Sequence, residues 1–123
     1  MLAHGDLKAE HVLITSPARI ALIDFDACSG AEPAVDLGRV LAEVRWALLA
    51  SQSDARAEAQ GQFLKGYMAS GPVPPERLLR ARVYELVAFI RIAMRYLKLW
   101  APGWRAAAEG ALVRAAEIAR ELE

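Results

Sequence analysis

Two short polar stretches near the start of the chain decide its fold, His4-Gly5-Asp6-Leu7-Lys8-Ala9-Glu10-His11 and Ile23-Asp24-Phe25-Asp26. Between them lie two runs of strand-forming residues, Val12-Leu13-Ile14-Thr15 and Ile20-Ala21-Leu22-Ile23, joined by the turn Ser16-Pro17-Ala18. Runs rich in β-branched residues on either side of a Ser-Pro turn predict a small β-hairpin. We therefore expect the two polar stretches to meet at the open end of this hairpin.

Three chemically active side chains should converge there: Asp6, His11 and Asp24. A carboxylate such as Asp6 can take a proton, and Lys8, two residues further on, can neutralise an oxyanion. His11 and Asp24 are both residues of the kinds that bind metal ions. Together these groups are the parts of a phosphoryl-transfer site.

Three motifs at these positions resemble one known family. The first stretch resembles the catalytic loop of the aminoglycoside phosphotransferase and choline kinase family, written H-G-D-x-x-x-x-N, and also the protein-kinase loop H-R-D-L-K-P-E-N. Ile23-Asp24-Phe25-Asp26 resembles the metal segment I-D-[FW]-[DEG] of the same family. Glu32-Pro33-Ala34-Val35-Asp36-Leu37 is similar to its D-P-x-x-D-L segment, with glutamate replacing the first aspartate. The order and spacing also match, and the resemblance covers residues 4–37.

The resemblance implies an enzyme that uses ATP and Mg²⁺ to phosphorylate a hydroxyl group of a small molecule. Asp6 would be the catalytic base, and Asp24 the main Mg²⁺ ligand. Lys8 would either approach the transferred phosphate or be an ordinary solvated lysine. His11 stands where the family usually has asparagine, and imidazole is a softer ligand than Mg²⁺ prefers. Direct metal ligation, contact through a water and simple support of the loop are therefore all open for His11.

The resemblance gives supporting roles to three further residues. His4 would brace the catalytic loop through an imidazole hydrogen bond. Asp36 would be a helix N-cap that also accepts hydrogen bonds from the loop backbone. Asp26 is either a second metal ligand or a hydrogen-bond acceptor, and we favour the supporting role.

The chain enters the catalytic loop after only three residues. In a kinase-like fold this loop belongs to the C-terminal lobe and follows a nucleotide-binding lobe. The sequence has no glycine-rich phosphate loop, no strand lysine for the phosphates and no glutamate partner for such a lysine. We therefore expect residues 1–123 to be a single partial domain, a kinase-like C-terminal lobe with the N-terminal nucleotide lobe absent, and to be inactive alone.

Within this partial domain, residues 4–37 would form the catalytic and metal-binding segment and residues 38–123 a helical subdomain. The expected class is α+β and mostly α, with a short β-hairpin followed by about four helices. Residues 27–33 are predicted to be a loop. The predicted helices run from Asp36 to about Ala50, from a Ser53 N-cap to about Ala69, from Glu76 to about Leu99, and from about Trp104 to Leu122.

Hydrophobic periodicity predicts which helix faces are buried. In the first helix the apolar stripe consists of Leu37, Val40, Leu41, Val44 and Leu48. In the third helix it consists of Leu79, Val83, Leu86, Ile90, Ala93 and Leu97, with a second strip of Leu78, Phe89 and Tyr96. The third helix should therefore be covered on more than one side.

Composition bounds the remaining possibilities. The formal net charge is zero, which gives no general attraction to nucleic acid or to anionic membranes. The single Cys28 allows no internal disulfide, as expected for a cytoplasmic protein. The most apolar stretch, residues 83–100, is interrupted by four charged residues, so we expect no membrane span.

Five basic residues of the third helix share one face: Arg77, Arg80, Arg91, Arg95 and Lys98. They form either a solvated face or the border of an acceptor cleft that suits an anionic substrate. The three tryptophans could stack on a sugar, although such residues in apolar helices usually belong to the core.

Three other functions stay open. The chain could be a degenerate kinase-like binding module or a self-associating helical interaction protein. A metal-dependent hydrolase using His4, Asp6, His11 and Asp24 is the least favoured, because this spacing matches no hydrolase motif.

Overall fold

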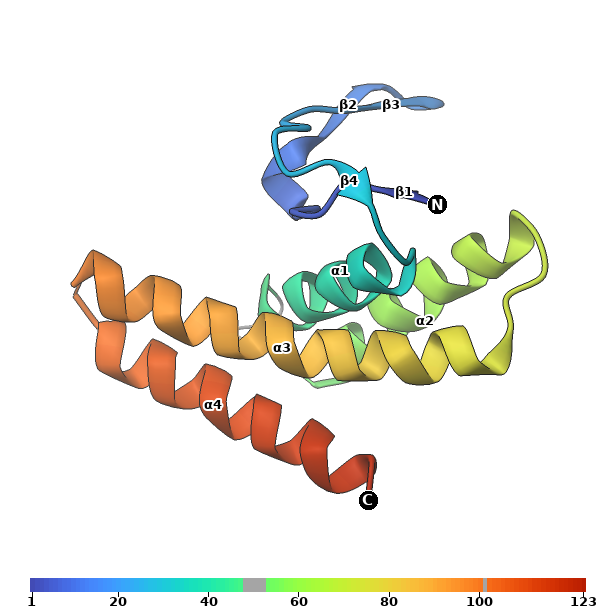
Figure 1. Cartoon of the computed structure of the whole chain (residues 1–123). Helices are drawn as coiled ribbons and strands as arrows, with labels where there is room; N and C mark the ends of the chain where they lie inside the picture. The colour runs from blue at the N-terminus through green and yellow to red at the C-terminus, as the bar shows by residue number, and fades with distance from the viewer. Residues whose placement is uncertain (48–52, 101) are drawn as a thin grey trace.

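The computed structural model describes residues 1–47, 53–100 and 102–123. A small β region at the N-terminus lies on a layer of helices (Figure 1). The elements follow one another as β1 (Leu2–Ala3), a 3-10 turn (Ala9–His11), β2 (Val12–Ser16), β3 (Arg19–Leu22), β4 (Ser29–Gly30), α1 (Ala34–Ala47), α2 (Ser53–Ala69), α3 (Pro75–Leu99) and α4 (Trp104–Glu121). The prediction of a mostly helical α+β chain with a short hairpin and four helices is confirmed for the described residues.

The predicted hairpin is formed by β2 and β3. These strands pair antiparallel, with Val12 opposite Leu22 and Ile14 opposite Ile20. The prediction of a plain loop over residues 27–33 is wrong in part, because β4 pairs antiparallel with β1. A strand of two residues has no periodicity of its own, so only its partner reveals it.

The helix boundaries agree with the sequence except at the start of α1. This helix begins at Ala34, and Asp36 therefore lies in its first turn and is not its N-cap. Acidic side chains are favourable in a first turn because the helix dipole is positive there. The predicted end near Ala50 lies outside the described residues. The predicted Ser53 cap is not tested, because the residues just before Ser53 are not described. The start of α4 at Trp104 is as predicted, and α3 starts at Pro75, one residue before the predicted Glu76.

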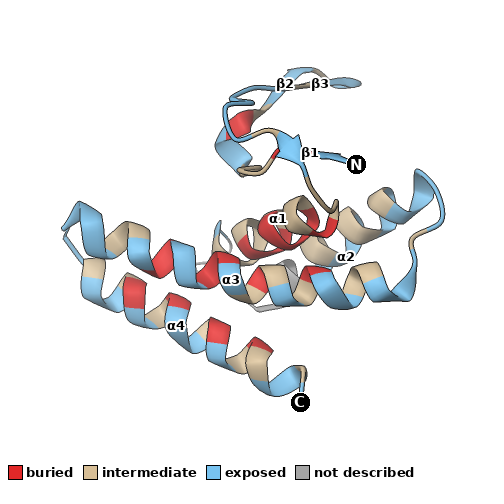
Figure 2. Ribbon diagram, in the orientation of Figure 1, coloured by how far each residue is buried: buried red, intermediate tan, exposed pale blue. Residues whose placement is uncertain are grey.

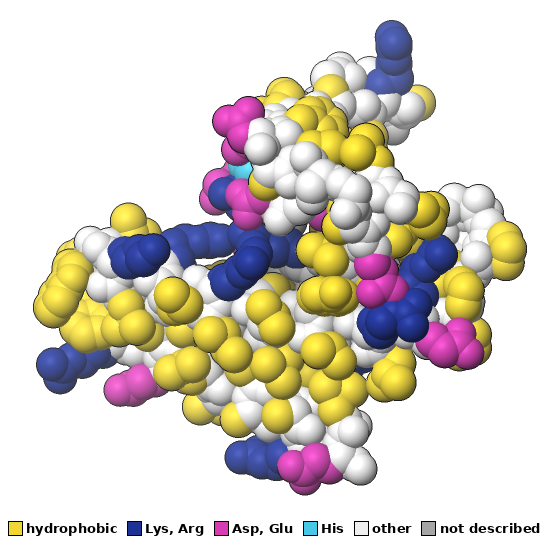
Figure 3. Space-filling model, in the orientation of Figure 1, with side chains coloured by type: hydrophobic (Ala, Val, Ile, Leu, Met, Phe, Trp, Pro, Cys, Tyr) yellow, Lys and Arg dark blue, Asp and Glu magenta, His cyan; other side chains and the backbone are white. Residues whose placement is uncertain are grey.

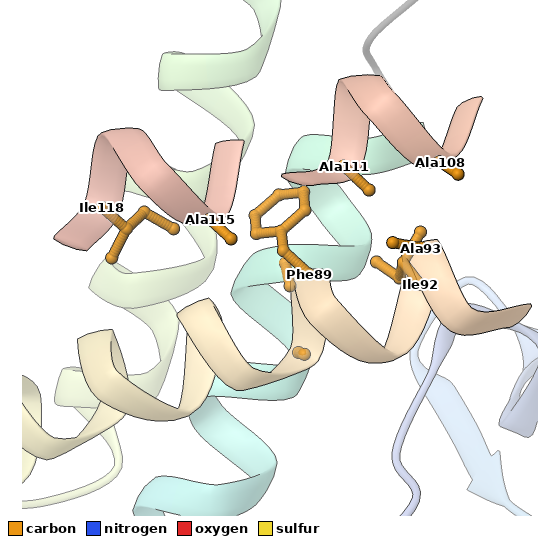
Figure 4. Close-up of a cluster of buried hydrophobic side chains, with 9 residues drawn as sticks. Phe89, Ile92, Ala93, Ala108, Ala111, Ala115 and Ile118 are labelled. Carbon is orange, nitrogen blue, oxygen red and sulfur yellow. The ribbon is translucent and has the colours of Figure 1, made fainter. Parts of the chain in front are cut away.

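The largest core cluster lies mainly between α3 and α4 (Figure 4). Phe89 of α3 is fully buried and points at the facing helix. The face of α4 towards it carries small residues and one isoleucine, namely Ala108, Ala111, Ala115 and Ile118. Small side chains let two helices approach closely, so that dispersion contacts form along their whole length.

The predicted core stripe of α3 is wrong for most of its members. Leu79, Val83, Ile90 and Leu97 are between 39% and 59% exposed, and of the stripe only Ala93 is buried. The buried face of α3 lies instead along small residues, Phe89 and a charged residue: Ala81, Glu85, Ala88, Phe89, Ile92 and Ala93. Figure 2 shows this face in red against α1 and α4. The periodicity argument failed because it gave weight to large apolar side chains and none to alanine or to a paired glutamate.

Glu85 is fully buried and joins three helices. Its carboxylate accepts from Gln60 of α2 at 3.3 Å and pairs with Arg45 of α1 at 3.4 Å and with Arg82 of α3. A buried charge is tolerated only when it is paired and hydrogen-bonded. This polar network fixes how α1, α2 and α3 pack, and sequence reasoning did not find it.

None of the helices in the described part of the chain has the length and apolar character needed to cross a membrane.

Candidate functional site

The polar stretch that begins at His4 is held to α1 by hydrogen bonds from its backbone to one side chain of that helix. The backbone N–H of His4 donates to Asp36 at 2.7 Å, and that of Gly5 donates to its second carboxylate oxygen at 2.9 Å. Gly5 has a φ of +80°, and a Cβ there would lie 2.4 Å from the Ala27 carbonyl oxygen. Only glycine fits this position, because the φ is unfavourable for other residues and there is no space for a side chain.

His4 connects this loop to the segment after the hairpin. Its Nε2 lies 2.9 Å from the Ile23 carbonyl oxygen. The ring packs against Phe25, with centroids 4.8 Å apart, and stacks on His11 at 5.6 Å. The imidazole thus makes the kind of hydrogen bond expected of a residue that supports the loop, and this role stays a prediction.

The three side chains expected at the open end of the hairpin do converge. Asp6, His11 and Asp24 each place a ligand atom so that all three atoms lie within 4.8 Å of one another. Nε2 of the buried His11 is 3.0 Å from Asp24 Oδ2. The hairpin produces this geometry, since a backbone hydrogen bond from Ile23 to His11 extends the β2–β3 pairing by one step. The role of each side chain stays a prediction.

Asp24 has a left-handed backbone with a φ of 64°. Aspartate tolerates this conformation better than most residues, but it still costs free energy relative to an extended backbone. The turn lets the chain leave β3 sharply and brings the Asp24 carboxylate back towards His11. Strained residues of this kind are enriched at functional sites.

Asp6 is held by two cations. Arg39 of α1 reaches one carboxylate oxygen at 2.7 Å, and Lys8 reaches the other at 3.1 Å. Burial acts to raise the pKa of Asp6, but the Lys8 hydrogen bond and the Arg39 charge outweigh it, so the pKa lies below its usual range. Asp6 is therefore ionised and fixed in direction at neutral pH.

Arg39 is the site residue that sequence reasoning missed. It is 9% exposed and lies with its guanidinium against the catalytic loop. A signal was available, since Arg39 follows Asp36 by three residues and such neighbours share a helix face. A prediction that Asp36 faces the loop would therefore have placed Arg39 there too.

The two carboxylates of the Asp6, His11 and Asp24 cluster suit Mg²⁺, and the imidazole suits it less well. Asp6 and Asp24 offer the hard oxygen ligands that Mg²⁺ prefers. A metal-bound histidine normally donates its other ring N–H to an acceptor. Nδ1 of His11 is buried without a hydrogen-bond partner among the described residues. If Nε2 bound a metal, the ring proton would be on Nδ1 and this N–H would be unpaired. If Nε2 instead carries the proton and donates it to Asp24, no N–H of the ring is left unpaired.

Asp26 and the basic residues of α3 differ in whether they lie near the cluster. Asp26 is exposed and makes no hydrogen bond or ion pair within the described residues. The basic face of α3 divides: Arg80 pairs with Glu32 near its start, while Arg91, Arg95 and Lys98 line a cavity with Asp6.

The tryptophans divide as well. Trp46 packs into the core, with its ring 6.4 Å from that of Phe89 and its Nε1 donating to Tyr96 at 3.4 Å. Trp100 is 73% exposed, so it does not belong to the core.

Comparison with models of protein families assigns the sequence to a known family. Residues 1–72 match the model of the phosphotransferase enzyme family, known as APH. The match covers more than half of the chain, and the chain therefore belongs to this family. It also includes every residue of the Asp6, His11 and Asp24 cluster. Comparisons with curated proteins and with solved structures give no match.

Proposed function

We propose that Asp6, His11 and Asp24 supply the catalytic base and the metal site of a phosphotransferase. This enzyme would move the γ-phosphoryl group of ATP to a hydroxyl group of a small molecule. One observation carries the proposal. Asp6, His11 and Asp24 bring their ligand atoms within 4.8 Å of one another inside the segment that matches the family. Phosphoryl transfer depends mostly on such positioning and on charge stabilisation.

Asp6 is the proposed base. It accepts a hydrogen bond from the acceptor hydroxyl and takes the proton as the acceptor oxygen bonds to the γ-phosphorus and the bond to the leaving ADP oxygen breaks. The lowered pKa of Asp6 suits this order, because the transition state is loose and the hydroxyl loses its proton late. Arg39 and Lys8 hold the carboxylate in place for this task.

Asp24 is the proposed Mg²⁺ ligand. When bound, the ion would neutralise charge on the transferring phosphoryl group. His11 lies against the Asp24 carboxylate at 3.0 Å and fixes its position, with or without touching the metal. Asp36 keeps Asp6 in register with this pair, because it holds the backbone of the two preceding residues.

The isolated chain should not turn over ATP. None of its 123 residues forms a glycine-rich phosphate loop, so the α- and β-phosphates have no dedicated grip. We infer that a nucleotide-binding segment must act together with these residues. ATP turnover by the purified chain that disappears in Asp6→Ala would contradict this part of the proposal.

Metal binding tests the site directly. We expect Mn²⁺, titrated by calorimetry as a substitute for Mg²⁺, to bind the purified chain and to bind much more weakly to Asp24→Asn. Glu109→Gln is the matched control, since it removes an exposed carboxylate on α4 that makes no hydrogen bond or ion pair within the described residues. Equal binding by both variants, or no binding by the wild type, would overturn the proposal.

The same titration decides the role of His11. If His11 is a ligand, His11→Asn supplies an amide oxygen and should shift the preference from Mn²⁺ towards Mg²⁺. If His11 only positions Asp24, the ratio of the two affinities should stay as it is in the wild type.

A degenerate binding module is the second candidate. The observation that favours it is the 3.0 Å contact of His11 Nε2 with Asp24 Oδ2, which occupies a carboxylate oxygen that a metal would need. A chain that binds nucleotide in its complete form, with neither metal affinity nor turnover, would favour this alternative.

A further inference from the structure

An open cleft of about 320 Å³ lies beside Asp6. Four cationic side chains line it together with Asp6 and Met94, namely Arg39 of α1 and Arg91, Arg95 and Lys98 of α3. Figure 3 shows Lys and Arg side chains gathered in the recess between the β region and α3, next to the acidic and histidine side chains. Asp6, the proposed catalytic base, therefore lies beside a cleft lined with positively charged side chains.

The cations of this cleft are only partly neutralised by the protein. Arg39 is engaged by Asp6 at 2.7 Å, and Arg95 by Glu43 at 3.1 Å. Arg91 and Lys98 are exposed and make no ion pair within the described part of the chain. Two positive charges thus line the cleft with no ion-pair partner among the residues that the structure describes.

A second cavity borders the cleft, because the two have lining residues in common. It holds about 240 Å³, shares Arg39 and Arg91 with the first, and adds Gly5, Tyr84 and Val87 among its lining residues. A ligand across the two cavities would meet Asp6, the cations and an apolar floor. Ligand sites commonly combine an apolar lining with a few placed polar groups in this way.

We propose that the acceptor is an anionic alcohol, a small hydroxyl compound that carries a phosphate or carboxylate group. Arg91 and Lys98 bind its anionic group, the Val87 and Tyr84 side chains contact its carbon skeleton, and its hydroxyl lies at Asp6. Arginine suits this task because its planar guanidinium pairs with both oxygens of such a group. The inference rests on the proposed function, since the role of Asp6 makes this ligand an acceptor. A polycationic aminoglycoside would be repelled by the same positively charged side chains.

Anion binding can be measured on the chain itself by NMR, with the backbone amides as reporters. Glycerol 3-phosphate is the probe, glycerol the neutral comparison and kanamycin the polycationic one. We expect glycerol 3-phosphate to shift the amides of Gly5 and of residues 84–98, glycerol to shift them little, and kanamycin to leave them unchanged.

Charge removal shows whether the binding is local. The double variant Arg91→Gln/Lys98→Gln should weaken glycerol 3-phosphate binding about tenfold, as expected for the loss of charged hydrogen bonds at an exposed site. Lys65→Gln/Arg120→Gln is the matched control, because it removes the same charge from exposed positions on α2 and α4. This control should bind like the wild type.

Four results would overturn the inference: no shifts with glycerol 3-phosphate, equal weakening in the two double variants, tighter binding of kanamycin, or displacement of glycerol 3-phosphate from these amides by ADP. The last would assign the cations to the phosphate donor. Failure of the proposed function is seen separately in the Mn²⁺ titration. Asp24→Asn should abolish metal binding and leave anion binding intact.

Discussion

Replacing Gly38 by alanine should destabilise the fold, although the same change usually stabilises a helix. Gly38 lies in α1 where this helix crosses α3. A Cβ at this position would lie 2.4 Å from the Ala81 carbonyl oxygen, 2.6 Å from Tyr84 Cβ and 2.7 Å from the Glu85 backbone nitrogen. Two of these atoms are backbone and the third is a Cβ, so no flexible side chain can move aside. The helices themselves must separate.

Two effects of opposite sign decide the size of the change. Alanine improves the intrinsic stability of a helix over glycine by about 1 kcal/mol. Overpacking a close contact typically costs about 1–3 kcal/mol, and contacts to backbone place Gly38→Ala at the upper end. We expect a net loss of about 1–2 kcal/mol in the free energy of unfolding. For a chain of this length that lowers the melting temperature by about 4–8 °C.

Urea and thermal unfolding of matched variants measure this difference. Gly66→Ala in α2 is the control, because nothing lies within 4 Å of its added Cβ. The control should be as stable as the wild type or gain up to about 1 kcal/mol. If Gly38→Ala proves as stable as Gly66→Ala, the close crossing of α1 and α3 is not a feature of the protein in solution. The placement of Arg39 opposite Arg91 would then fail with it.

Three further changes test the network, the loop and the base. Glu85→Gln should lower the free energy of unfolding by about 2–3 kcal/mol, because the partly buried Arg45 and Arg82 lose their fully buried counter-charge, whereas the exposed Glu109→Gln should change it little; equal urea curves would contradict the network. Asp36→Ala should lower the free energy of unfolding by about 1–3 kcal/mol and speed hydrogen exchange of the two loop amides that donate to Asp36. Asp36→Asn should have a smaller effect because it keeps one acceptor, and unchanged exchange would contradict the contact. Since the folded-state pKa of Asp6 is lowered, its carboxylate stabilises the fold above the unfolded value of about 3.9, and this contribution disappears as the pH falls through the lower folded value. The stability difference between wild type and Asp6→Asn, measured with EDTA present, should therefore be constant near neutral pH and shrink under acid, and a difference independent of pH would refute the assignment.

The sequence alone was sufficient for most local elements and for the convergence of Asp6, His11 and Asp24. The hairpin follows from two β-branched runs and a Ser-Pro turn, which are short-range signals. The helix starts at Pro75 and Trp104 follow from proline and glycine, which act on their own backbone. The meeting of Asp6, His11 and Asp24 follows from the hairpin. When the two strands pair, the residues before the first strand are brought next to the residues after the second. Motif spacing then identified the family.

Tertiary structure alone decided which faces are buried and what surrounds the base. Hydrophobic periodicity placed Leu79 and Val83 in the core, but α1 and α4 pack on the alanine face of α3, where backbones approach more closely. The burial of Glu85 depends on Gln60 and Arg45, which lie 25 and 40 positions away in sequence, and Arg39 lies 33 positions from Asp6. No local preference encodes such pairs, since a charged side chain on a helix is stable in water until a partner makes burial less costly. The basic cleft arises in the same way, from cations on two helices that only the packing of α1 against α3 brings to Asp6.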